Sequence, residues 1–147
     1  MKKIFIYYSM TGNGDKVSDV FKEKGYDIRK VISKVKYPKS KFFLMMYGGS
    51  RIVFNKKDKL IDFNNDISSY DEVVIGSPIW MDSVSSPINS VLDKIDLTNK
   101  KIKFVLYSAG GEAGRASEFI KKNYNSDIVI LKEPKSNTKE LDKLINF

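Results

Sequence analysis

Neither cysteine nor histidine occurs among the 147 residues of this chain. Their absence excludes disulfides, zinc sites built from cysteine and histidine, cysteine nucleophiles and triads with a histidine base. No apolar run approaches the roughly 20 residues of a membrane span. The apolar stretch after the basic N-terminus ends at Ser9, too early for a signal peptide. We therefore expect a cytoplasmic protein that folds as one domain over residues 1–147.

Acidic residues are almost missing from one segment of the chain. Residues 30–59 hold nine lysines and arginines against Asp58 alone, and this local excess of +8 equals the net charge of the whole chain. The segment is either a solvated face or a surface for an acidic partner protein, an anionic ligand or a nucleic acid. Arginine is also scarce, with 3 arginines against 23 lysines. Because base readout favours arginine, we expect no specific nucleic-acid partner.

Apolar runs alternate with amphipathic stretches along the sequence. The pattern predicts strands at residues 3–8, 26–32, 71–75, 101–107 and 127–131. It predicts helices at residues 15–24, 86–95, 115–123 and 138–146, and a further helix capped by Ser40 that runs through Tyr47. Strands that alternate with helices in this way indicate a parallel sheet covered on both faces. We expect an α/β/α sandwich with a five-stranded parallel sheet of order 2-1-3-4-5.

Three unusual loops are expected at the carboxyl edge of this sheet, where such sheets bind ligands. Residues 9–14 place hydroxyls, an amide and glycines before a helix, which suits a phosphate or an ordinary capped turn. Residues 76–83 contain Trp80, the only tryptophan, which either stacks on a flat ligand or covers the core. Residues 108–114 include three glycines, which either let the backbone approach a planar ligand or simply turn the chain.

These motifs resemble those of the flavodoxin family, in particular its short FMN-binding members. The resemblance rests on SMTGN, YDEVVIGSPIW and YSAGGEAG, and it covers essentially the whole chain. It implies a flavodoxin-like fold and an FMN whose phosphate is surrounded by Ser9, Met10, Thr11, Gly12, Asn13 and Gly14. It implies an isoalloxazine that lies between two groups of residues: Pro78, Ile79, Trp80, Met81 and Asp82 on one side, and Ser108, Ala109, Gly110, Gly111 and Gly114 on the other.

The chain departs from the family in three respects. Gly14 replaces the usual threonine or serine, and the lost hydrogen bond to a charged group corresponds to roughly 1.5–3 kcal/mol. The third loop lacks the aromatic residue that covers the second flavin face in many members, so this face is expected to be open. The family's electron carriers look acidic, whereas this chain carries +8, which predicts a less reducing flavin.

Two functions agree with this resemblance. The first is electron transfer between redox partners through a non-covalently bound FMN, with an acidic partner docking near Lys34–Lys59, and this is the function that we expect. The second is an NAD(P)H-dependent FMN oxidoreductase of the quinone reductase type, in which Arg51 or nearby lysines attract the nicotinamide phosphate. Because the flavin does the chemistry in both, we expect no catalytic side chain and no metal. A non-flavin receiver module is disfavoured, since residues 8–10 offer no acidic cluster.

Overall fold

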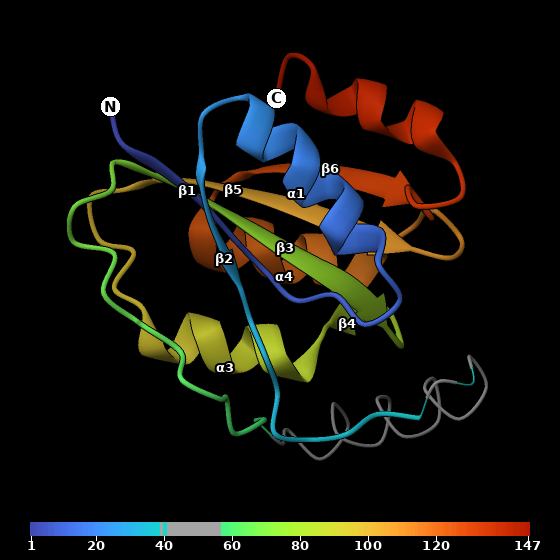
Figure 1. Ribbon diagram of the computed structural model, residues 1–147, viewed down its shortest axis with the longest axis horizontal. Helices are drawn as coiled ribbons and strands as arrows, with labels where there is room; N and C mark the ends of the chain where they lie inside the picture. The colour runs from blue at the N-terminus through green and yellow to red at the C-terminus, as the bar shows by residue number, and fades with distance from the viewer. Residues whose placement is uncertain (39, 41–56) are drawn as a thin grey trace.

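The computed structural model describes residues 1–38, 40 and 57–147. Its sheet has five parallel strands in the order β2-β1-β3-β5-β6 (Figure 1). Their bounds are Lys3–Tyr7 for β1, Asp27–Lys30 for β2, Glu72–Trp80 for β3, Lys101–Ser108 for β5 and Asp127–Lys132 for β6. The α/β class is confirmed, and these five strands have the predicted 2-1-3-4-5 order. The structure adds a short strand that the sequence did not predict, β4 (Ser83–Val84), antiparallel to the end of β3.

Helices cover both faces of the sheet (Figure 1). Helix α1 (Asn13–Glu23) and the 3₁₀-helix η1 (Thr138–Leu144) lie on one face, and α3 (Ser86–Lys94) and α4 (Gly114–Tyr124) lie on the other. The two-residue period of β1 explains this division, because Phe5 and Tyr7 pack toward α1 while Ile4 and Ile6 pack toward α3. Among the described residues, no helix is long and apolar enough to cross a membrane.

Helix α1 follows β1 after a short turn. Gly12 has a φ of 95°, a left-handed conformation that glycine adopts without the steric cost of a side chain. Val17 and Phe21 are then buried on one face, and the Phe21 ring stacks on Phe5 with 4.5 Å between centroids. Full burial of such a side chain stabilises the fold by about 1.5–3 kcal/mol. This packing fixes the N-terminus of α1 at the carboxyl end of β1.

Strand β3 corrects one prediction. The sequence predicted a strand that ends at residue 75 and a loop over residues 76–83, but β3 continues through Trp80. Only Met81 and Asp82 connect β3 to β4, with φ of 50° and 59°, as in a tight two-residue hairpin turn. Pro78 misled the prediction, because proline is rarely found inside a strand with neighbours on both sides. Trp80 therefore stands at the end of a strand rather than in a loop.

The two ends of the basic segment meet next to the sheet. The backbone N–H of Lys34 donates to the carbonyl of Lys59 at 2.8 Å, and Ser33 forms a bridge with Leu60. The lysines at both ends, Lys34, Lys36, Lys57 and Lys59, are exposed. The helix that was predicted to run from Ser40 through residue 47 lies, apart from Ser40 itself, outside the described residues, as does Arg51.

Candidate functional site

The turn between β1 and α1 is organised around the side chain of Ser9. Its hydroxyl oxygen accepts hydrogen bonds from the backbone N–H of Gly12 at 3.2 Å and of Gly14 at 3.0 Å. The side-chain amide of Asn13 reaches the hydroxyl of Thr11 at 3.4 Å. The first N–H groups of a helix have no partner within the helix, and they carry a partial positive charge. The N-terminus of α1 therefore favours an anion through its partial charge, while Ser9 engages the N–H groups of Gly12 and Gly14 and fixes the shape of the turn.

One carboxylate lies near this helix N-terminus, and cationic and polar groups hold it. The Asp15 carboxylate accepts hydrogen bonds from the ammonium of Lys30 at 2.7 Å and the hydroxyl of Tyr7 at 2.8 Å. Burial alone would raise the pKa of Asp15, but these bonds and the charges of Lys30 and Lys135 hold it below its ordinary value. The negative charge that could repel an anion in the turn is thus paired with a lysine.

Gly14 is surrounded on the side where a side chain would project. A Cβ atom there would lie 2.5 Å from the Tyr107 hydroxyl oxygen and 2.8 Å from Ser9 Cβ and Tyr7 Cδ2. Burial raises the pKa of Tyr107 well above its usual range, so its hydroxyl stays protonated and donates to the carbonyl of Tyr8. The threonine or serine expected at position 14 has no room here, because a tyrosine hydroxyl from β5 occupies the space.

A cavity of about 280 Å³ opens beside this turn at the carboxyl edge of the sheet. Eight of the predicted site residues line it: Thr11, Asn13, Pro78, Ile79, Trp80, Met81, Ser108 and Ala109. Three segments distant in sequence thus meet at one place, as predicted for the carboxyl ends of β1, β3 and β5. Its walls are mostly apolar, and the polar groups of Thr11 and Asn13 lie at the α1 end.

Trp80 lines this cavity, but its ring is largely covered. Only 6 % of the residue is exposed, because Tyr37 packs on the ring with 4.8 Å between centroids and Tyr8 meets it edge-on at 5.9 Å. The hydroxyl of Tyr37 in turn donates to the buried carboxylate of Asp58. Stacking of Trp80 on a ligand stays a prediction, and in this arrangement it requires the ring to turn away from its aromatic neighbours.

The third loop is arranged differently from the predicted row of amides. The hydroxyl oxygen of Ser108 accepts hydrogen bonds from the N–H groups of Gly111 at 2.9 Å and Glu112 at 3.1 Å. These two N–H groups are therefore engaged within the loop. The remaining predicted residues do not line the cavity: Ser9, Met10, Gly12 and Gly14 form the turn or its flank, and Asp82, Gly110, Gly111 and Gly114 lie to the side.

Asp82 has a structural contact that the sequence did not indicate. Its carboxylate accepts a hydrogen bond from the backbone N–H of Arg115 at 3.0 Å, and the Arg115 Nε atom lies 3.7 Å away. Arg115 is in the first turn of α4, where backbone N–H groups need partners. The hairpin between β3 and β4 is thereby fastened to the N-terminus of α4, which fixes the wall formed by Met81.

The sequence analysis missed three residues near this cavity. Tyr107 and Glu133 line it, and Lys135 contacts the turn before α1. Tyr107 was read only as part of a buried strand. Glu133 and Lys135 follow β6, the last strand at one side of the sheet, and no glycine or aromatic cluster marks that loop. The one available signal was position, since the carboxyl end of every parallel strand reaches the same edge.

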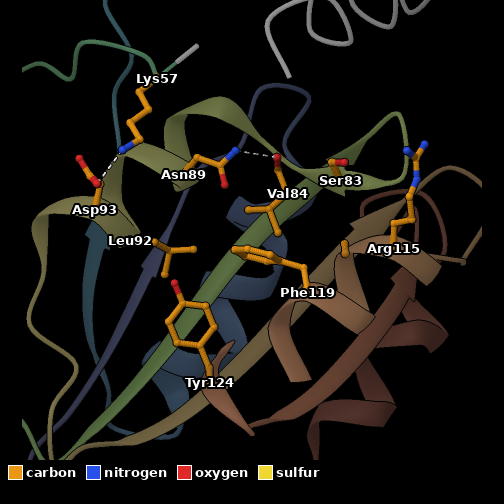
Figure 2. A pocket seen from close by; sticks show the side chains of 10 residues that line it. Lys57, Ser83, Val84, Asn89, Leu92, Asp93, Arg115, Phe119 and Tyr124 are labelled. Atoms are coloured by element: carbon orange, nitrogen blue, oxygen red, sulfur yellow. Dashed lines mark hydrogen bonds and ion pairs between the residues drawn. The ribbon is translucent and has the colours of Figure 1, made fainter. Parts of the chain in front are cut away.

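A second, larger cavity of about 540 Å³ is lined by residues of β4, α3 and α4 (Figure 2). Four of its residues form two pairs. The Lys57 ammonium lies 2.6 Å from an oxygen of Asp93, and the Asn89 amide donates to the carbonyl of Val84 at 3.4 Å (Figure 2). None of the predicted site residues lines this larger cavity, so we place the candidate cofactor site in the smaller one.

The fold and the site define a class of protein. Its members have a doubly wound sheet and bind a phosphorylated ligand at the turn between the first strand and the first helix. The sequence matches the profile of the family described as Flavodoxin over residues 2–145. The chain belongs to the flavodoxin family. No curated protein matches the sequence.

Several solved structures share this fold. A candidate flavoprotein from Bacteroides uniformis is 18% identical with a TM-score of 0.79, and the match covers 99% of this chain and 98% of that one. A candidate flavoprotein from Bacteroides eggerthii is 22% identical with a TM-score of 0.74 and the same coverage of both chains. A flavoprotein from Lactobacillus acidophilus, solved in complex with FMN, is 20% identical with a TM-score of 0.68, covering 94% of this chain and 97% of that one.

Proposed function

We propose that the protein is a cytoplasmic electron carrier in which a non-covalently bound FMN passes electrons between redox partners. The observation that carries the proposal is the cavity between the ends of β1, β3 and β5, next to the N-terminus of α1. Sheets of this order bind ligands at that edge, and a helix N-terminus favours a phosphate. The FMN complex of the similar protein from Lactobacillus acidophilus supports the same cofactor.

The residues at the site fit FMN at both of its ends. Gly12 and Gly14 donate their backbone N–H groups to Ser9, which shapes the turn, and the partial positive charge of the α1 N-terminus beside it suits the phosphate. Pro78 and Ile79 offer an apolar wall for the flat ring. When bound, FMN supplies the redox chemistry. The residues of the chain bind and orient it, and they exclude water from one side of the ring.

Two features favour a carrier over an NAD(P)H-dependent oxidoreductase. The cavity of about 280 Å³ is near the small end of ligand sites, which accommodates one flat ligand rather than a flavin with a nicotinamide beside it. The exposed lysines Lys34 and Lys59 are neighbours on the surface and Lys36 is exposed close to Lys34 in the sequence, and these lysines would attract an acidic redox partner.

Titration of the purified protein with FMN tests the cofactor. We expect saturable binding with one FMN per chain, followed by the change in flavin absorbance and by quenching of the fluorescence of Trp80. Because Trp80 lines the cavity, its emission should fall in proportion to the bound fraction. Equilibrium dialysis that detects no retained FMN would overturn the proposal.

Anaerobic addition of NADH or NADPH to the FMN-loaded protein separates the two functions. For a carrier we expect no bleaching beyond that of free FMN at the same concentration, and full bleaching by a chemical reductant such as dithionite. Rapid bleaching by either nucleotide alone would instead support the oxidoreductase.

A further inference from the structure

Lys135 joins the loop after β6 to the turn before α1. Its ammonium donates to the carbonyl of Thr11 at 3.1 Å, and its backbone N–H donates to the side-chain oxygen of Asn13 at 3.0 Å. These two bonds fall on either side of Gly12. The loop after the last strand is therefore fastened directly to the segment that borders the candidate phosphate site.

The side chain of Lys135 also lies against the backbone of Gly12. A Cβ atom at Gly12 would be 3.1 Å from Lys135 Cδ and 3.2 Å from its Nζ atom. The three atoms nearest to this Cβ position all belong to Lys135. The ammonium of this exposed lysine is thus held at the turn by a hydrogen bond.

The Lys135 ammonium interacts electrostatically with Asp15, but hydrogen bonds pair that carboxylate with other residues. Asp15, the nearest carboxylate on α1, is bound by Lys30 at 2.7 Å and by Tyr7. An ammonium has three N–H donors, and the bond to Thr11 uses one of them. Two donors and a full positive charge can therefore serve a phosphate beside the turn. The backbone amides of the turn supply hydrogen bonds but only a partial charge.

We propose that Lys135 is a phosphate-binding residue of the FMN site and that it makes the protein select FMN over riboflavin. The inference rests on the proposed binding of FMN. Riboflavin has the same ring and ribityl chain but no phosphate, so a cation at the phosphate end distinguishes the two ligands. Lys135 thereby replaces the interaction that is lost because position 14 carries no hydroxyl.

The test compares the dissociation constants of FMN and riboflavin for the full-length wild type, Lys135→Met and Lys139→Met. Lys139 is an exposed lysine of η1, so its replacement makes the same change in net charge away from the turn. We expect Lys135→Met to weaken FMN binding about tenfold or more, the range for a lost hydrogen bond to a charged group. Riboflavin binding should change less than about twofold, as should both ligands in Lys139→Met. Lys135→Arg should retain most of the preference for FMN.

The outcomes separate this inference from the proposed function. If the wild type binds no FMN, the proposed function and the role of Lys135 are both wrong. If the wild type binds FMN and Lys135→Met binds it as well as Lys139→Met does, only the role of Lys135 is overturned. An equal loss of FMN and riboflavin affinity would also overturn it, because a merely structural lysine would affect both ligands alike. Dissociation constants at several salt concentrations add a second readout, since FMN binding by Lys135→Met should depend less on salt.

Discussion

Gly14 lacks the hydroxyl that the family usually has at this position, yet the structure requires a glycine there. The family's usual hydroxyl residue would need space that the hydroxyl of Tyr107 already occupies, with Ser9 and Tyr7 closing the other sides. Tyr107 is buried and holds the carbonyl of Tyr8 by a hydrogen bond. Glycine at position 14 and tyrosine at position 107 therefore form a matched pair across the start of α1.

We predict that Gly14→Ala destabilises the fold. The added Cβ would lie 2.5–2.8 Å from packed side chains, closer than carbon atoms in proteins approach one another. Inserting a methyl group into a filled space costs roughly 1–3 kcal/mol in the free energy of unfolding. Urea denaturation of the apoprotein measures the free energy of unfolding of Gly14→Ala and of the wild type.

Gly110→Ala is the matched control for this substitution. No atom lies within 4 Å of the position of its Cβ, and Gly110 belongs to another loop at the same edge of the sheet. We expect its free energy of unfolding to stay within about 0.5 kcal/mol of the wild type. Equal stability of the two alanine variants would show that the space at Gly14 is not filled.

Much of the candidate site could be predicted at the residue scale, and the failures have a common cause. Thr11, Asn13, Pro78 and Ser108 line the cavity as expected, because local motifs after strands identify them. The contact between Lys135 and Thr11 joins residues 124 positions apart. No local pattern carries such information, since the contact exists only once β6 has taken its place in the sheet.

At the scale of elements, local periodicity in the sequence predicted which segments form strands and helices. It did not predict where each of them ends. The sequence predicted β1 and α1 to within about two residues, since β1 is a continuous apolar run and α1 has a clear apolar period with Gly12 before it and Gly25 after it. Strand β3 exceeded its prediction because a residue outside the strand, Ser85, contacts Ser77 within it. The Ser77 hydroxyl oxygen accepts the backbone N–H of Ser85 at 3.1 Å, just before α3. This tertiary contact outweighed the local effect of Pro78.

A buried ionic cluster connects the amino ends of the central strands. Glu72 lies at the start of β3, is 2 % exposed and accepts a hydrogen bond from Tyr26. Its carboxylate oxygens lie 3.3 Å from the Lys101 ammonium and 3.8 Å from the Lys103 ammonium. Burial would raise the pKa of Glu72, but the bonds from Tyr26 and Lys101 and the charge of Lys103 hold it below its ordinary value. The fold therefore favours the ionised carboxylate.

We predict that this cluster makes stability depend on acidic pH. A carboxyl group with a lowered pKa in the folded state stabilises the fold fully above its unfolded pKa, about 4.3 for glutamate, and loses this contribution as the pH falls through the folded value. Glu72→Gln should reduce the decline in the free energy of unfolding below about pH 4.3. It should also cost roughly 1–3 kcal/mol at pH 7, because Lys103 loses its buried charged partner.

Urea denaturation between pH 3 and pH 7 measures this dependence. Glu23→Gln, at the exposed end of α1, is the control and should follow the wild-type profile. Identical pH profiles for the wild type and Glu72→Gln would show that another group governs the acid transition.

At the scale of the whole molecule, the positive charge should change the properties of the bound flavin. The chain carries +8, whereas the carriers that it resembles look acidic. A unit charge about 10 Å away contributes roughly 0.4 kcal/mol in water, and about 1.4 kcal/mol corresponds to about 59 mV for one electron. A positive field stabilises the anionic reduced flavin. We therefore predict that the reduction potential of the semiquinone/hydroquinone couple is tens of millivolts less negative than in an acidic flavodoxin.

Spectroelectrochemical titration of the FMN-loaded protein measures this potential. Salt provides an internal control, because screening weakens the field of exposed charges. The potential should therefore become more negative as the salt concentration rises. A couple as reducing as that of an acidic flavodoxin, with no response to salt, would contradict the electrostatic explanation.

The single tryptophan has a practical consequence for work on this protein. Trp80 sits at the border between the cavity and the core, in contact with Tyr37 from the edge of the basic segment. One intrinsic chromophore is therefore sensitive to two events, loading of the cofactor and loosening of the interior. Emission intensity and emission wavelength distinguish the two, so unlabelled protein suffices to follow both in a single sample.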